Sequence, residues 1–274
     1  MPFLTVSFVI SILIQLVLPI GLGVLIMRRY HTPWRLLTVG VAAYLVFQIV
    51  ELPLFQAIGG TEFYTTQIVN LPPVAYAILT GFLAAIIEQA IRTGGFLLVR
   101  NSVQTWGGGL TVTAGYAGIE SALIGLQLLL TLIFALTYNP AVPGSTLTPE
   151  EAASLQAQVT SFWQLPWYLP LVAGLQRMAV FLMQSALGIM VWLAISRRMW
   201  VWVGAALAWQ TAMNTLSVIL AASMPNLGTI ALYILIGVVN GAILVLLYKK
   251  TGAAQEVIPD LAPAKGSKKQ AEPK

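Results

Sequence analysis

The chain has 274 residues, of which 58% are hydrophobic and only 8% are charged, and its mean hydropathy is +0.84. Soluble domains usually carry about 25% charged residues, so the composition excludes a cytosolic enzyme and a nucleic-acid-binding protein. The net charge of +5 does not indicate nucleic acid either, because four of the six lysines lie in the last ten residues. The sequence predicts an all-α, polytopic membrane protein whose surroundings are the lipid bilayer.

Apolar stretches long enough to cross a membrane occur seven times along the chain. The hydrocarbon core of a bilayer is about 30 Å thick and needs roughly 20 apolar residues per helix. In chain order, the predicted spans are Phe3–Met27, Leu36–Ile58, Pro72–Val99, Leu110–Leu136, Trp167–Ile195, Val201–Ala222 and Leu227–Tyr248. Together they form one predicted transmembrane domain over residues 1–250.

Basic residues mark every second connection between these spans. Twelve of the fourteen follow the first, third, fifth and seventh spans, two lie inside spans, and the alternate connections contain none. Connections rich in Lys and Arg stay in the cytoplasm. We therefore expect the N-terminus outside and the C-terminus in the cytoplasm. Separately, we expect the protein in the bacterial cytoplasmic membrane.

Two segments outside the spans have recognisable patterns. The external loop 138–166 contains Thr148-Pro149-Glu150-Glu151, a capping box with proline at the first helical position. It predicts a short interfacial helix to about Val159, in an ordered loop rather than a substrate gate. The tail 251–274 is rich in Pro, Ala and Lys and has no apolar periodicity, which predicts a disordered basic cytoplasmic tail.

Four charged side chains lie within spans three to six, where each costs about 2.5–3.5 kcal/mol on insertion scales. They are Glu88, Arg92, Glu120 and Arg177. Glu88 and Arg92 are four residues apart and share a helix face. The sequence leaves two interpretations open: charges that hold the helices together, or a functional site.

Uncharged polar residues accompany these charges at helical spacing. Tyr116 precedes Glu120 by four residues, Gln184 follows Arg177 by seven, and Gln210 precedes Asn214 by four. The rise of 1.5 Å per residue places most of them in one layer near mid-membrane, with Arg177 further out. The sequence therefore predicts one polar cluster shared by four helices.

These residues resemble the motifs of the YhfC-type intramembrane peptidases, which are grouped with glutamic-type membrane proteases such as the CAAX-prenyl endopeptidases. Ile87–Arg92 is similar to the family's Glu-Glu-x-x-Arg motif, and Gly115–Glu120 to its Gly-His-Gly-Gly-x-Glu motif. Arg177 with Gln184, and Gln210 through Asn214, resemble its later motifs. The resemblance runs through spans two to six and implies an intramembrane protease fold.

The chain differs from the family at motif positions that carry histidines and acidic residues in the family. The second glutamate of the first motif is Gln89, and the final aspartate is Asn214. Three histidine positions of the family are occupied by Tyr116, Gln184 and Gln210. The one histidine, His31, lies in a cytoplasmic loop and cannot replace them.

Three functions remain compatible with this pattern, and whether the chain is an enzyme stays open. The first is a non-catalytic or impaired relative of these proteases whose polar cavity, lined by Arg92, Tyr116, Arg177, Gln184, Gln210 and Asn214, binds a membrane segment or a transmembrane partner. The second is an active glutamic-type protease in which Glu88 and Glu120 activate water for a transmembrane protein or peptide substrate. The third is a small-solute transporter. We expect no cofactor and no metal, since zinc prefers His, Cys or carboxylate ligands and only two carboxylates are available in the cluster.

Overall fold

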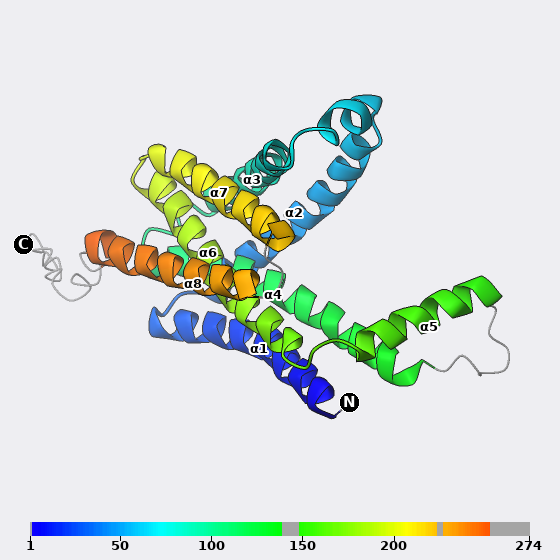
Figure 1. Cartoon of the computed structure of the whole chain (residues 1–274). Coiled ribbons are helices and arrows are strands. Elements are labelled where there is room, and N and C mark those ends of the chain that lie inside the picture. The colour runs from blue at the N-terminus through cyan, green and yellow to red at the C-terminus, as the bar shows by residue number, and fades with distance from the viewer. Residues whose placement is uncertain (1, 139–147, 224–226, 253–274) are drawn as a thin grey trace, which may run out of the picture.

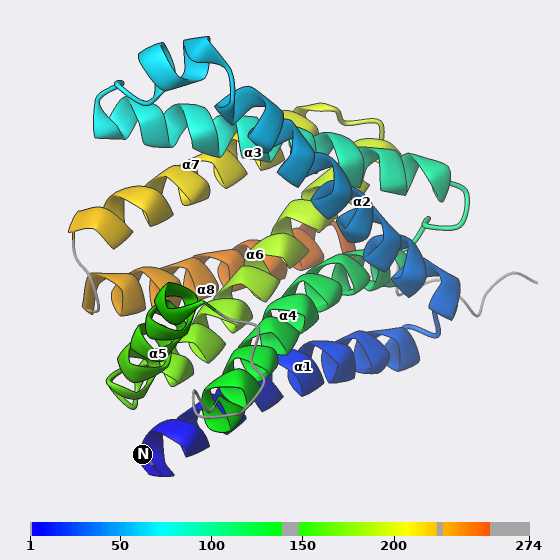
Figure 2. The same ribbon diagram turned by 90° about the vertical axis from the view of Figure 1, so that its right-hand side faces the viewer.

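The computed structural model describes residues 2–138, 148–223 and 227–252. Within these ranges the chain consists of helices and the turns that join them, and contains no strand, as Figures 1 and 2 show. The helices are α1 (Pro2–Arg29), α2 (Trp34–Gly59), α3 (Pro73–Leu98), α4 (Trp106–Thr137), α5 (Pro149–Trp163), α6 (Leu169–Ser196), α7 (Val201–Ser223) and α8 (Leu227–Leu247), with π-helical segments η1 (Tyr64–Ile68) and η2 (Tyr248–Gly252). Seven of them are long and apolar enough to span a membrane, which confirms the predicted fold class.

Among the seven spans, the largest boundary difference lies at the start of α4, which begins at Trp106 rather than at Leu110. The side-chain oxygen of Thr105 accepts a hydrogen bond of 3.1 Å from the Gly108 N–H and caps the helix. Three consecutive glycines follow Trp106, and glycine is a weak helix former. Buried packing of this segment outweighs that low propensity.

Helix α6 lies at the centre of the bundle and contacts α1, α3, α4, α7 and α8 (Figure 2). Its residues from Met183 to Ala194 are all buried. In the most apolar 18-residue stretch of α6, 78% of the residues are buried, compared with 17–28% in the corresponding stretches of the other six spans. The outer helices therefore present apolar faces to lipid, whereas α6 is enclosed by protein.

Glycines allow α2 and α4 to approach each other closely. A Cβ atom at Gly40 would collide with the carbonyl oxygen of Val112, and one at Gly115 with the carbonyl oxygen of Leu37. Small residues at a helix crossing bring the two backbones together and increase van der Waals contact, which drives helix association in lipid. This crossing fixes α2 against the helix that contains Tyr116 and Glu120.

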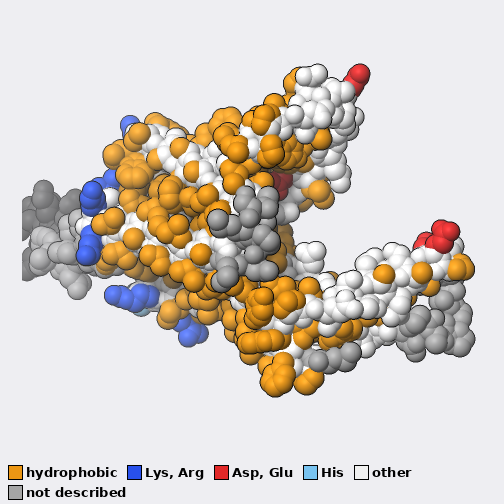
Figure 3. All heavy atoms as spheres, in the orientation of Figure 1, with side chains coloured by type: hydrophobic (Ala, Val, Ile, Leu, Met, Phe, Trp, Pro, Cys, Tyr) orange, Lys and Arg blue, Asp and Glu red, His pale blue; other side chains and the backbone are white. Residues whose placement is uncertain are grey.

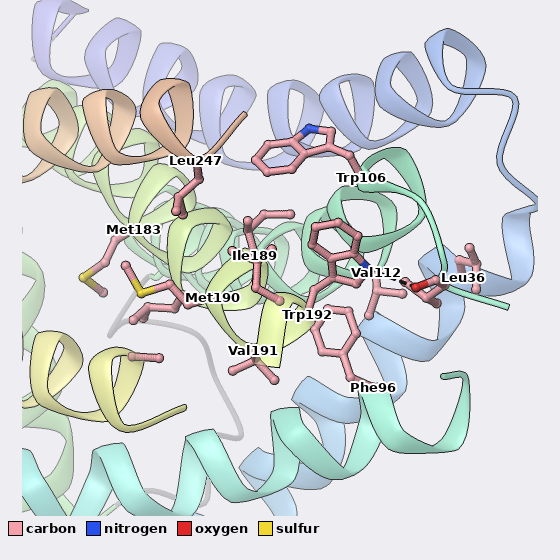
Figure 4. Packing of buried hydrophobic residues seen from close by; sticks show 14 of the residues in the cluster. Leu36, Phe96, Trp106, Val112, Met183, Ile189, Met190, Val191, Trp192 and Leu247 are labelled. Atoms are coloured by element: carbon pink, nitrogen blue, oxygen red, sulfur yellow. Dashed lines mark hydrogen bonds between the residues drawn. The ribbon is translucent and has the colours of Figure 1, made fainter. Parts of the chain in front are cut away.

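An aromatic cluster packs α6 against the turn between α3 and α4 (Figure 4). Trp192 lies between Trp106 and Phe96, and the Trp106 and Trp192 rings meet edge to face with centroids 5.9 Å apart. The Trp192 indole N–H donates a hydrogen bond of 2.9 Å to the Val103 carbonyl. The buried indole is thus satisfied, and the α3–α4 turn is tied to α6.

The two ends of the bundle carry opposite charge, as Figure 3 shows. Lys and Arg gather at one end, here called the basic end. Arg28 is in the last turn of α1, and Arg100 and Arg198 follow the ends of α3 and α6. The acidic end divides into two lobes, one over α2, η1 and α3 and the other over α4 and α5. This asymmetry follows the distribution of charge along the sequence, and the orientation of the ends across a membrane stays a prediction.

Helix α5 begins with the predicted capping box. The Thr148 hydroxyl oxygen accepts a hydrogen bond of 3.2 Å from the Glu151 N–H, and the Thr148 N–H donates one of 2.8 Å to the Glu151 carboxylate. The helix continues past Val159 to Trp163, where Phe162 stacks on Phe8 of α1 at 4.6 Å. Residues 139–147 of the external loop and 253–274 of the predicted disordered tail lie outside the described residues.

Candidate functional site

Four helices bring the predicted polar residues together inside the bundle. Helix α3 contributes Glu88 and Arg92, α4 contributes Tyr116 and Glu120, α6 contributes Arg177 and Gln184, and α7 contributes Gln210 and Asn214. On α3 and α4 the spacing of four residues turns both members of a pair to one face. Seven of the eight interact in one connected group, here called the polar network; Asn214 bonds elsewhere.

Glu88 is at the centre of the polar network and is only 6% exposed. Its Oε1 atom accepts hydrogen bonds from Arg92 Nη2 at 2.6 Å and from Gln184 Nε2 at 2.9 Å. Its Oε2 atom accepts a further bond from the side-chain amide of Gln210. The carboxylate is thus held by one guanidinium and two amides, which compensate for the loss of hydration.

Glu120 is the second carboxylate of the polar network. Its Oε2 atom accepts a hydrogen bond of 2.8 Å from Gln184 Nε2, and its Oε1 atom pairs with Arg177 Nη1 at 3.3 Å. Gln184 therefore bridges the two glutamates, and its own carbonyl oxygen accepts from Arg92. This glutamine stands at a position that the resemblance assigns to histidine, and here it donates to both carboxylates.

Tyr116 acts through its ring. The Arg92 guanidinium carbon lies 4.4 Å from the centre of the Tyr116 ring, a cation–π contact between two buried side chains. Tyr44 of α2 packs edge-on against Tyr116, with centroids 5.1 Å apart. The Tyr116 ring covers the guanidinium of Arg92, and Tyr44 supports the Tyr116 ring.

A cavity of about 220 Å³ lies beside the polar network. Asn214 lines it, although the Asn214 amide donates at 3.4 Å to the Gly81 carbonyl and does not contact either glutamate. The complete lining is Glu88, Glu120, Gln176, Arg177, Val180, Met183, Gln184, Gln210, Met213, Asn214, Ser217, Tyr233 and Ile236. Polar groups line this cavity together with apolar side chains of α6, α7 and α8.

Two groups near the site were not among the predicted site residues. Gln89 is 2% exposed and donates to the carbonyl oxygen of Gln210. On α2, Gln48 donates at 2.7 Å to the Tyr44 hydroxyl, and half-buried Glu51 follows it by three residues on the same face. The sequence could have indicated Glu51, because it is a carboxylate within an apolar stretch and lies seven residues after Tyr44, on the same helix face.

The polar network leaves two of its own buried atoms without a partner, and the adjacent Gln89 leaves a third. Within the described part of the chain, Arg92 Nη1, Tyr116 Oη and Gln89 Oε1 have no hydrogen-bond partner. Buried polar groups are nearly always satisfied by protein or by ordered water. Ordered water molecules could therefore attach at these three atoms, none of which belongs to a residue that lines the cavity.

The donor set of the site does not fit a metal ion. Among the described residues, no group of three or more His, Cys, Asp or Glu side chains is placed to hold one. The two glutamates of the cavity are paired with Arg92 and Arg177, whose positive charges would repel a cation. His31 lies in the turn between α1 and α2 and does not line the cavity.

Comparison with known proteins places this arrangement in a family. The family model described as YhfC intramembrane metalloprotease matches residues 14–248. A protein of Bacillus subtilis (strain 168), described as an uncharacterized membrane protein YhfC, is 26% identical over 208 residues, covering 72% of this chain and 75% of its own length. No solved structure matches the chain. Since the family model runs from the middle of α1 through α8 and includes the polar network, the chain belongs to the YhfC family of membrane proteins.

Proposed function

We propose that this YhfC-family protein uses its cavity to bind a membrane-embedded polypeptide segment, and that it hydrolyses peptide bonds poorly or not at all. One observation carries the proposal: all four carboxylate oxygens of Glu88 and Glu120 accept hydrogen bonds from side chains of the protein itself. Such carboxylates serve as fixed acceptors. Taking a proton from water would weaken the ion pair and the hydrogen bonds that hold each glutamate, because the ionised carboxylate is the stronger acceptor.

Hydrolysis also needs a group that protonates the leaving amine. General acid–base catalysis uses a titratable side chain within hydrogen-bond reach of the reacting atoms. Gln184 and Gln210 line the cavity at two of the histidine positions implied by the resemblance, and amides do not exchange protons in this way. Tyr116, at the third position, and Arg92 are not part of the cavity lining, although we expected both there. The two glutamates are the acids nearest the cavity, and both are engaged in ion pairs.

Binding suits the cavity better. A helix that enters a membrane protein and unwinds exposes peptide N–H and C=O groups, which need partners because the bilayer core holds little water. Gln176, Asn214 and Ser217 offer such partners, and Met183 and Met213 offer adaptable apolar contacts beside them. An unwound peptide segment can therefore be satisfied here along its backbone while its side chains pack against methionine.

Crosslinking tests the binding directly. A photo-reactive residue at Ser217, which lines the cavity, should capture a transmembrane protein or peptide in the bacterial cytoplasmic membrane, where we expect this protein. The same residue at Val218 is the matched control, because Val218 is adjacent on α7 but 46% exposed on the outer surface. Equal capture at both positions would show that the cavity is not the binding site.

Cleavage tests the second half of the proposal. Purified protein in liposomes should leave a panel of membrane-segment peptides intact, with Glu88→Gln and Glu120→Gln indistinguishable from wild type. The alternative is an active glutamic-type protease. The family description as an intramembrane metalloprotease favours protease activity but not this mechanism, which the two carboxylates that line one cavity favour. Cutting that either substitution abolishes and a chelator leaves unchanged would establish that alternative and overturn ours.

A further inference from the structure

A second hollow lies at the basic end of the bundle, away from the polar network. It has a volume of about 500 Å³ and separates the turn between α3 and α4 from the turn between α6 and α7. Its lining is Leu97, Arg100, Asn101, Gln104, Ile195, Ser196, Arg198 and Trp200. Two arginines and several amide or hydroxyl groups thus surround one space, and no acidic side chain lines it.

The two arginines are available for an anion. Within the described part of the chain, neither Arg100 nor Arg198 forms an ion pair or donates a side-chain hydrogen bond. The neighbouring Arg197 differs, because its guanidinium donates at 3.2 Å to the Thr251 carbonyl. The two adjacent arginines therefore have different contacts: Arg197 bonds the end of α6 to η2, and Arg198 lines the hollow.

Backbone geometry and burial support a built site. Arg198 has a φ angle of 57°, a left-handed conformation that is uncommon for a residue with a Cβ atom. Strained residues of this kind gather at ligand sites. The Ser196 hydroxyl oxygen, which lines the same hollow, is buried and has no hydrogen-bond partner among the described residues.

The surroundings favour an amphiphile over a soluble anion. The hollow lies where α3 and α6 end, at the level at which the spans leave the apolar core. Leu98 is 87% exposed beside it and Trp200 is 56% exposed on its rim. An exposed tryptophan at a helix end is typical of the membrane interface, where basic pockets on the cytoplasmic side bind lipid head groups.

We propose that this hollow binds the head group of an anionic phospholipid, with its phosphate between Arg100 and Arg198 and its acyl chains along the apolar surface near Leu98. Such a lipid joins two turns that are distant in the sequence. One turn follows the helix that contains Glu88 and Arg92, and the other lies between the helices that contain Gln184 and Gln210. The bound lipid thus holds together the helices that build the polar network.

Native mass spectrometry can test this assignment. Wild-type protein in micelles with equal amounts of phosphatidylglycerol and phosphatidylcholine should retain one phosphatidylglycerol, with a preference of roughly 10- to 30-fold from two arginines at a membrane surface. R100Q/R198Q should reduce the preference to less than about 2-fold. R28Q/R35Q, which removes two exposed arginines from the same end, should keep it.

Each other result overturns the proposal. A preference that persists in R100Q/R198Q, or that falls equally in R28Q/R35Q, means that net charge and not this hollow selects the lipid. Displacement of the phosphatidylglycerol by inorganic phosphate at constant ionic strength means that the hollow is a site for a soluble anion. If R100Q/R198Q does not fold, the wild-type measurement still decides, because a protein without any preference for phosphatidylglycerol has no such site.

Discussion

Replacement of Glu88 by glutamine should destabilise the protein strongly. Glu88 accepts hydrogen bonds from Arg92, Gln184 and Gln210 through its two oxygens. A glutamine at this position keeps one acceptor oxygen and turns its amide N–H₂ toward a donor. The substitution also removes the ion-pair partner of Arg92. The Arg92 side chain is only 3% exposed, so its charge would stay buried and uncompensated.

The size of this effect follows from the burial. Breaking a buried ion pair by removing one partner costs about 3–5 kcal/mol. The remaining acceptor oxygen of glutamine puts Glu88→Gln near the lower limit, at about 3 kcal/mol. For a chain of this size each kcal/mol corresponds to roughly 2–4 °C, so the unfolding midpoint should fall by roughly 6–12 °C.

Tryptophan fluorescence during thermal unfolding in micelles measures this midpoint, since the chain contains eight tryptophans. Glu51→Gln is the matched control: the same chemical change within a span, at a half-buried carboxylate that makes no hydrogen bond or ion pair in the described part of the chain. Its midpoint should stay the same or rise. A Glu88→Gln variant as stable as wild type would falsify the assignment of Glu88 as the centre of a buried, charge-paired network.

A double-mutant cycle separates the ion pair from the rest of the polar network. Arg92→Gln alone should also destabilise the protein, because Glu88 then loses its charged donor and Tyr116 its cation. In Glu88→Gln/Arg92→Gln no uncompensated charge remains. The double variant should be less destabilised than the sum of the single variants by about 2 kcal/mol, and additive effects would argue against direct coupling.

Three further predictions concern the packing, the external helix and the topology. Gly40→Ala should cost about 3 kcal/mol or prevent folding, because its Cβ meets a carbonyl oxygen of α4. Gly21→Ala is the control and should be tolerated, because the space around Gly21 is open. Equal yields of monodisperse protein from the two variants would contradict the close crossing of α2 and α4. The N–H and hydroxyl of the N-cap threonine hold the pKa of Glu151 below the ordinary value of 4.5, so the capping contribution is complete above that pH and is lost as the pH falls through the folded-state value. A carboxyl titration by NMR that gives Glu151 an ordinary or raised pKa would rule this out. The chain has no cysteine, so single cysteines can be introduced and labelled specifically. In intact cells, a cysteine at Ser154 should react with a membrane-impermeant thiol reagent, and one at Ser102 should not. The reverse result would invert the predicted orientation.

Much of the architecture could be predicted from local composition. Seven apolar stretches became seven long helices, and the capping box before Glu151 began a helix as expected. The start of α4 was misplaced by four residues because propensity underrates three glycines that are buried against other helices. Local preference is a weak guide wherever tertiary packing decides the outcome.

The candidate site was predictable in its members and unpredictable in its connections. Spacing along each helix showed that Glu88 and Arg92 share a face, and the cost of charge in a membrane marked them as unusual. It could not show that Gln184 bridges two glutamates, that Tyr116 contacts Arg92 with its ring, or that Asn214 turns toward a backbone carbonyl instead. These contacts depend on how the helices are rotated and crossed.

The sequence by itself determined the membrane class, the number of spans, the uneven placement of charge and the loss of the histidines that the family resemblance implies. These properties depend on composition and on periodicity within single helices, both of which are written along the chain. The tertiary structure alone decided which helix encloses the site, which donor reaches each carboxylate oxygen, and that two distant turns enclose a basic hollow. Such features arise from crossings like that of Gly40 against α4, where contacts between distant segments set the geometry.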